Sequence, residues 1–195
     1  GVYASVFYAD SKAYMTATSN VIDQEKMAII LQEVIGTEYN GRYYPSFSGV
    51  ARSLNYYPIN DEKAEDGVAE IAIGLGKYIV DGGRSLRFSP KYPHNVLQTS
   101  TLDLALRDTQ TQFYALDLTR TDQPFSVDDG YNLLKLNIRE AEKDGSLKMM
   151  VSTFDPYDQI IRDGYYEGGR KVVTFANILK HDVFPLAELL QMMLK

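Results

Sequence analysis

The stretch Gly74-Leu75-Gly76-Lys77 combines two features that bind phosphate in many nucleotide sites, glycines that expose the backbone and a lysine. Its spacing completes neither of the established motifs. A phosphate loop has four residues between its glycines and a Ser or Thr after the lysine, whereas Tyr78 follows Lys77. No Gly-x-Gly-x-x-Gly fingerprint opens a helix after a strand. Taken alone, Gly74 and Gly76 are therefore interpreted as close-packing glycines.

Other residues with catalytic chemistry are few. The absence of cysteine excludes disulfides, iron–sulfur clusters, cysteine-ligated zinc and a cysteine nucleophile. His94 and His181 have no partner at metal-ligand spacing, so surface or capping roles are favoured over catalysis. The carboxylates of Asp128-Asp129 and of residues 61–66 have the composition of a Mg²⁺ site, but we interpret them as solvated caps.

Composition narrows the class of protein. The 195 residues include 20 basic and 26 acidic side chains, a net charge of −6, which argues against general nucleic-acid binding. Hydrophobic residues make up 45%, as in globular domains, and no apolar run approaches the roughly 18 residues of a membrane span. Because no secretory leader is visible, we expect a cytoplasmic location. A chain that begins at Gly1 rather than Met suggests an excised piece.

Apolar spacing predicts the elements that must position these residues. We expect helices over residues 2–19 and from Asp66 to Leu75, a strand buried on both faces over 27–35, a hairpin at Asn40-Gly41 and a strand over 48–55. Further on, we expect strands at 86–88, 112–118 and 149–151 and helices at 131–144 and 185–195. This irregular alternation favours an α+β fold, a mostly antiparallel sheet with packed helices.

Three blocks, in order, resemble the nucleotide-binding N-terminal region of the phosphoenolpyruvate synthase and pyruvate phosphate dikinase family. The first is the apolar strand over 27–35, which ends in Gln, any residue and Val. The second is the Ser-Gly-Val-Ala strand within residues 47–55. The third is the Gly-Leu-Gly block within residues 74–83. Residues 100–195 match less distinctly and are assigned by continuity.

The resemblance implies an ATP-grasp arrangement, in which two α+β lobes hold ATP between them. It places Gln32, Glu33 and Val34 at the connection that receives adenine, and Ser48 and Gly49 at a strand start near the nucleotide. We infer from charge that Arg52 meets phosphate. Where the family has Glu after Gly-Leu-Gly, this chain has Lys77. Either the lysine contacts phosphate or this subgroup does not use the position.

The resemblance also implies a larger parent enzyme. Residues 1–195 would form a partial ATP-grasp domain, and the Mg²⁺ ligands, the phospho-accepting histidine and the remaining domains would lie outside this chain. The expected function is the ATP-binding lobe of a phosphotransferase that moves a phosphoryl group from ATP through an enzyme histidine to pyruvate. The alternatives are a related ATP-grasp dikinase with another acceptor and a non-catalytic binding module with the same lobe fold. ATP is the expected ligand, without nucleic acid or membrane.

Overall fold

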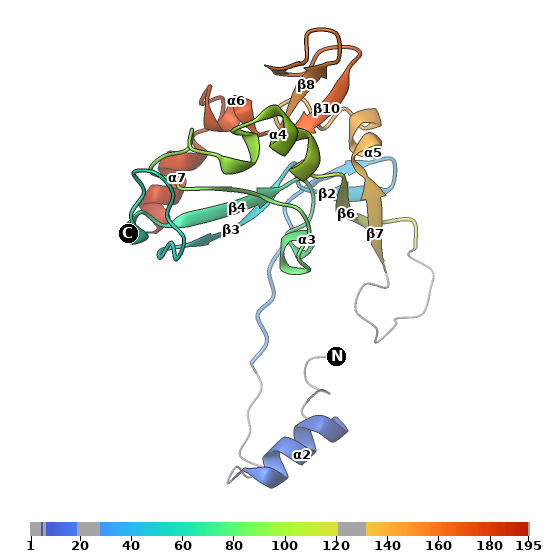
Figure 1. Cartoon of the computed structure of the whole chain (residues 1–195). Coiled ribbons are helices and arrows are strands. Elements are labelled where there is room, and N and C mark those ends of the chain that lie inside the picture. The colour runs from blue at the N-terminus through green and yellow to red at the C-terminus, as the bar shows by residue number, and fades with distance from the viewer. Residues whose placement is uncertain (1–4, 6, 19–27, 121–131, 195) are drawn as a thin grey trace. The chain divides into compact units, whose positions relative to one another are not determined.

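The computed structural model describes residues 5, 7–18, 28–120 and 132–194 (Figure 1). The chain divides into two compact units, Gly1–Val34 with Gln123–Tyr131, and Ile35–Asp122 with Asn132–Lys195. In the first unit the described regular element is α2 (Ala9–Ala17), which confirms the middle of the helix predicted over 2–19. Among the described residues, no helix has the length and apolarity to cross a bilayer.

The strand predicted over residues 27–35 is wrong for its described part. Residues 28–36 have no regular secondary structure, and the side chains of Ile30 and Leu31 are 84% and 92% exposed. A continuous apolar run is typical of a strand that is buried between neighbouring strands. A strand forms only where adjacent strands pair its backbone N–H and C=O groups, and no described strand pairs with this segment.

The second unit is built on three antiparallel sheets, which confirms the predicted α+β fold. The first sheet has the order β1-β2-β6-β7. The predicted hairpin is present: Thr37 pairs with Tyr44, and Asn40 and Gly41 in the turn have φ of 51° and 80°, as a tight hairpin turn of this twist requires. Its strands are β1 (Thr37–Tyr39), β2 (Arg42–Tyr44), β6 (Gln112–Asp117) and β7 (Leu133–Asn137).

The second sheet, of order β3-β4-β5, corrects the helix predicted from Asp66 to Leu75. Residues Val68 to Ala72 form its central strand and are buried at four of five positions. When both faces of a strand are apolar, some of its apolar residues also fall three and four positions apart, as in a helix. The β-branched side chains of Val68 and Ile71 favour a strand. The elements here are β3 (Ser48–Arg52), η2 (Ala64–Asp66), β4 (Val68–Ala72), α3 (Lys77–Val80) and β5 (Leu86–Phe88).

The third sheet, of order β10-β8-β9, is surrounded by short helices, and α7 lies alongside β3 and β4 (Figure 1). The helix predicted over 131–144 is correct only from Ile138, because the preceding residues pair with β6. The elements are η3 (Leu97–Thr99), α4 (Leu102–Asp108), α5 (Ile138–Lys143), β8 (Val151–Asp155), β9 (Ile160–Asp163), β10 (Arg170–Val173), α6 (Ala176–Leu179) and α7 (Leu186–Met193).

A polar cluster at the edge of the core links β2 to the segment after α5. Arg42 forms ion pairs with Glu140 and with Asp144, whose side chain is 1% exposed. The Tyr44 hydroxyl donates to Asp144 Oδ2 at 2.7 Å, and burial raises the pKa of this hydroxyl, which keeps it protonated. The cluster therefore satisfies a buried carboxylate with partners about 100 positions away in the sequence.

The carboxylate of Asp66 stabilises the fold to an extent that depends on pH. Its carboxylate accepts hydrogen bonds from Lys91 Nζ at 2.7 Å and from the Lys63 backbone N–H at 2.8 Å, and the Lys91 bond holds the pKa of Asp66 below its ordinary value. A lowered pKa stabilises the fold above the unfolded-state value of about 3.9, and this stabilisation is lost as pH falls through the folded-state pKa.

We therefore expect Asp66→Asn to lose less stability on acidification than the unsubstituted chain. Urea unfolding at pH values from about 6 to about 2 measures this difference. Asp158→Asn is the control, because Asp158 is an exposed carboxylate paired with Arg162 on the β8–β9 hairpin. Equal acid slopes for Asp66→Asn and the unsubstituted chain would contradict the assignment.

Candidate functional site

The structure brings the second and third sequence blocks together. Ser48 begins β3 and pairs with Ala72 of β4, so the loop that follows β4 returns beside the start of β3. Ser48 Oγ donates a hydrogen bond to the Gly74 carbonyl at 2.7 Å. We call the group formed by Ser48 and residues 74–77 the glycine-loop site.

Gly74 is fixed by a close approach to β6. Its φ is +83°, and a Cβ at this position would lie 2.7 Å from the Tyr114 carbonyl oxygen and 2.9 Å from the Phe113 ring. The next residue donates its backbone N–H to the same Tyr114 carbonyl at 3.0 Å. The interpretation of Gly74 as a close-packing glycine is confirmed.

Gly76 has a different environment. A Cβ here would lie 3.5 Å from the Ser48 Cβ, which is ordinary contact, and the φ of −59° suits any residue. Packing therefore does not require glycine at position 76. Glycine leaves this position without a side chain near Ser48, and this suits close approach by a phosphate or another polar ligand.

Lys77 lies at the start of α3, and its Nζ is 3.1 Å from Asp81 Oδ1. Asp81 also accepts a hydrogen bond from the Tyr114 hydroxyl. The pKa of this hydroxyl is raised, mainly because it is desolvated and further because the Asp81 carboxylate lies beside it. The rings of Tyr78 and Tyr114 meet edge to face at 5.6 Å. A lysine, a carboxylate and two tyrosines thus form one side of the glycine-loop site.

Sequence reasoning missed Asp81 and Tyr114 as supports of the site, and it also missed Gln110. The buried Gln110 amide accepts the Ile73 N–H at 2.8 Å and donates to the Ile73 carbonyl at 3.0 Å. These bonds fix the backbone directly before Gly74. No local pattern indicates such a role, because Gln110 and Ile73 are 37 positions apart.

The other predicted residues fall in two places. Gly49 follows Ser48 on β3, where a Cβ would lie 2.9 Å from the Glu70 carbonyl oxygen. Arg52 pairs with Val68 at the opposite end of β3, about 13 Å along the strand from Ser48. Gln32, Glu33 and Val34, to which the adenine role is assigned, are the last residues of the first segment of the first unit. Their roles, and that of Arg52, stay predictions.

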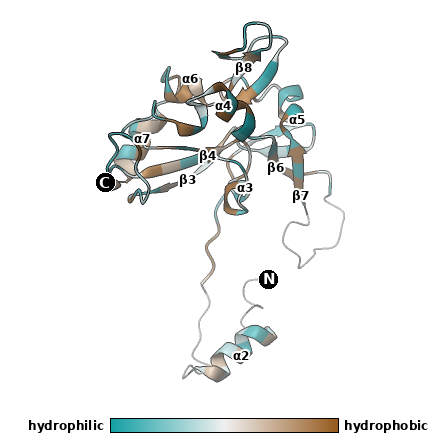
Figure 2. Cartoon of the chain, viewed as in Figure 1, coloured by the Kyte–Doolittle hydropathy of each residue, from teal (hydrophilic) through white to brown (hydrophobic). Residues whose placement is uncertain are grey.

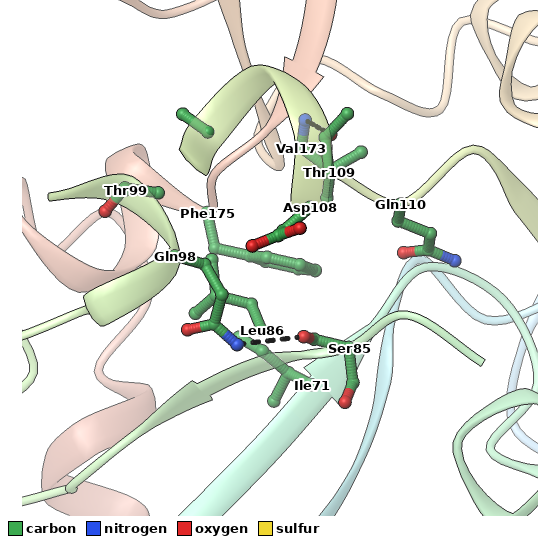
Figure 3. Close-up of a pocket in the computed structure, with 11 residues that line it drawn as sticks. Ile71, Ser85, Leu86, Gln98, Thr99, Asp108, Thr109, Gln110, Val173 and Phe175 are labelled. Atoms are coloured by element: carbon green, nitrogen blue, oxygen red, sulfur yellow. Dashed lines mark hydrogen bonds between the residues drawn. The ribbon is translucent and has the colours of Figure 1, made fainter. Parts of the chain in front are cut away.

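Two hollows of the second unit do not suit a nucleotide. The pocket in Figure 3, between β5, α4 and β10, has a volume of about 10 Å³, which is the space of one water molecule at most. Its walls are held by hydrogen bonds such as Gln98 Nε2 to the Ser85 carbonyl. The groove between β3, β4 and α7 measures about 430 Å³, but Glu70 is its sole charged lining residue, and it offers no cation for phosphate.

The predicted carboxylate cluster is explained by local structure where it is described. Asp66 caps the η2 turn, and Glu62 Oε2 accepts from Asn55 Nδ2 at 2.9 Å and from the Ile59 N–H at 3.1 Å. Within residues 28–120 and 132–194, no three His, Asp or Glu side chains are grouped as a metal site would need. Asp128-Asp129 lies outside the described residues.

An α+β unit whose glycine loop is held against a strand start, with a lysine at its edge, has the features of a nucleotide-binding domain. The family described as pyruvate phosphate dikinase, AMP/ATP-binding domain, matches residues 1–142 of the 195. The chain belongs to this family, whose domain is of the ATP-grasp type. Comparisons with curated proteins and with solved structures found no match.

Proposed function

We propose that this chain supplies the ATP-binding surface of a phosphotransferase that passes a phosphoryl group from ATP through an enzyme histidine to pyruvate. Family membership shows an ATP- or AMP-binding domain of a phosphotransferase. The observation that carries the proposal further is the contact of Ser48 with the Gly74 loop, because it joins two motifs that are 26 positions apart at one place. The histidine and the pyruvate site lie outside this chain in the proposal.

The glycine-loop site is assigned to the phosphate end of ATP. Gly76 has no side chain to obstruct a ligand beside Ser48, and the Lys77 ammonium supplies charge complementary to phosphate. Adenine is assigned to Gln32, Glu33 and Val34. This assignment is supported by the family membership and by the match of these residues to the connection that receives adenine in the family.

Magnesium is proposed as a companion of the nucleotide, since phosphoryl transfer from ATP generally needs a divalent cation to neutralise developing charge. The described residues of this chain do not fit a Mg²⁺ site, because they offer no cluster of carboxylates. As the resemblance implies, we propose that the Mg²⁺ ligands lie on other parts of the parent enzyme.

Calorimetric titration of the 195-residue chain with ATP and Mg²⁺ tests the division of the site. Because the proposal assigns part of the cleft to other domains, we expect binding weaker than micromolar by this chain and tighter binding by the parent enzyme. Micromolar binding by the chain alone would contradict the division. Binding by neither protein would contradict the nucleotide assignment itself.

Replacing Gln32 or Glu33 with alanine in the parent enzyme should raise the KM for ATP. Each change removes polar contact with the adenine edge, and the loss of one such hydrogen bond is about tenfold in affinity. Steady-state kinetics with pyruvate as acceptor measure the effect. Tyr157→Ala is the control, because Tyr157 is 95% exposed on the β8–β9 turn and should leave KM unchanged. Unchanged KM in both variants would remove the adenine assignment.

A further inference from the structure

A cavity of about 120 Å³ lies in the second unit, between α4, β9, α6 and the segment around η3. Its volume is about four times the share of one water molecule in the liquid, and it is well below the roughly 300–1,000 Å³ of sites for drug-sized ligands. Both helices that border it carry hydrophobic residues (Figure 2). The cavity therefore has room for a small organic molecule but not for a nucleotide.

The cavity has an apolar end and a charged end. Val96, Ala105 and Leu179 line it with side chains that are more than nine-tenths buried. Asp163 and Lys180 also line it, and their side chains are 30% and 46% exposed. The charged groups therefore lie where the cavity meets solvent, and the apolar walls lie inside.

The Asp163 carboxylate and the Lys180 ammonium hold each other loosely. Lys180 Nζ lies 3.5 Å from Asp163 Oδ2, and His181 Nε2 lies 3.3 Å from the same oxygen. Ser152 Oγ donates to Asp163 Oδ1, also at 3.3 Å. A charge-assisted hydrogen bond between an ammonium and a carboxylate is usually about 2.7–2.9 Å long. Both charged groups can therefore form closer bonds with a ligand than they form with each other.

The wall of the cavity contains a strained residue. Phe175 lies between the lining residues Thr174 and Ala176, is fully buried and has a φ of +51°. This left-handed conformation is unfavourable for a bulky side chain. Such strain occurs preferentially at ligand sites and other functional segments, where the surrounding structure enforces it. The strain at Phe175 is therefore a second indication, independent of the charges, that the cavity is a ligand site.

We propose that this cavity binds a small aliphatic α-amino acid. The ammonium group of the ligand pairs with Asp163 and its carboxylate with Lys180, while its side chain enters the apolar end. No lining residue belongs to the glycine-loop site, so the proposal is independent of the nucleotide assignment. The lining from Ile161 to Lys180 follows residue 142, where the family match ends, so the match does not assign this site.

A zwitterion fits these two charges better than an ion of either sign. An anion such as inorganic phosphate would be repelled by Asp163, and an amine without a carboxylate would be repelled by Lys180. A purely apolar molecule would cover both charged groups without offering them hydrogen bonds. Asp163 and Lys180 lie side by side, as the ammonium and carboxylate groups of an α-amino acid do.

Nuclear magnetic resonance of the isotope-labelled 195-residue chain, titrated with L-valine, tests the proposal. We expect the backbone amides of Thr174, Ala176 and Lys180 to shift with a Kd of about 1 mM or tighter, as a ligand of this size with two charged contacts allows. The Tyr157 amide, on the exposed β8–β9 turn, should not shift. Cavity amides that stay unchanged at L-valine concentrations far above this Kd would overturn the proposal and show a hollow filled by water alone.

Analogues of L-valine test the recognition of each group. Isovalerate lacks the ammonium, isobutylamine lacks the carboxylate, and glycine lacks the aliphatic side chain. We expect each of the three to bind at least about tenfold more weakly than L-valine, because each loses one of the three contacts. Isovalerate or isobutylamine that binds as tightly as L-valine would overturn the zwitterion as the ligand class.

Lys180→Met and Asp163→Asn test the two charged contacts in the protein. We expect each change to weaken L-valine binding at least about tenfold. Lys143→Met and Asp158→Asn are the matched controls, because both residues are exposed and neither lines the cavity. Circular dichroism checks the fold of every variant, and Lys180→Met decides if Asp163→Asn does not fold. Unchanged affinity in folded Lys180→Met would overturn the proposal.

Discussion

Replacing Gly74 with alanine should lower the free energy of unfolding by about 3 kcal/mol, because two penalties coincide. At φ +83° any side chain strains the backbone. The new Cβ would also lie 2.7 Å from the Tyr114 carbonyl oxygen, and that oxygen is fixed in the β6 backbone. The Leu75–Tyr114 hydrogen bond that closes the loop would be displaced as well.

Gly76→Ala is the matched control for this prediction. It is the same chemical change two positions away, with an ordinary φ and room for a methyl group. We expect a change within about 0.5 kcal/mol. Urea unfolding followed by circular dichroism measures both variants. Equal stabilities for the two would show that the approach of Gly74 to β6 does not constrain the loop.

Arg42→Met should lower the free energy of unfolding by about 3–5 kcal/mol, since it leaves the buried Asp144 carboxylate without its cationic partner. The side chain of Asp144 is 1% exposed, so water cannot replace the guanidinium without opening the cluster. The Tyr44 hydroxyl would remain as a neutral donor, which is insufficient to compensate a buried charge.

Lys143→Met provides the comparison for Arg42. Lys143 pairs with Glu140, which Arg42 also contacts, but its own side chain is 71% exposed. An exposed pair contributes about 0–1 kcal/mol, so we expect little change. Denaturant titration of both variants measures the two losses in the free energy of unfolding. A loss for Arg42→Met no larger than that for Lys143→Met would show that Asp144 does not depend on the arginine.

The sequence correctly predicted the helices and strands that are determined by residues close together in the chain. The Asn40-Gly41 hairpin follows from two residues that accept positive φ, and α7 follows from Pro185 at its start and a clear apolar stripe. The β6 strand was correct because its alternation is short and unambiguous. These are positions where sequence neighbours decide the backbone.

Errors arose where distant pairing decides the backbone. The apolar residues from Val68 to Leu75 fit the apolar stripe of a helix. Because β4 lies between two strands and buries both faces, the spacing of its apolar residues does not distinguish a helix from a strand. The glycines at 74 and 76 were the contrary signal, since each is unfavourable inside a helix. Leu133 to Asn137 were likewise taken into β7 by pairing with β6.

The candidate site divides in the same way. The glycine loop and Ser48 were indicated by the resemblance to the family, and the structure shows their contact. Asp81, Tyr114 and Gln110 could not be predicted, because each acts through a neighbour that only the folded chain brings close. The sequence therefore indicated the residues of the candidate site, and the fold was needed to show which residues hold them in place.

The family match ends at residue 142, yet the packed interior does not. Leu147, Met150 and Phe175 share one hydrophobic cluster with Tyr44 and Phe113, which are inside the match. A protein engineer who trimmed the chain at the family boundary would remove part of the platform beneath the glycine loop. The segment that the family model recognises is thus shorter than the packed core, and transplanting the glycine-loop site to another scaffold requires the longer piece.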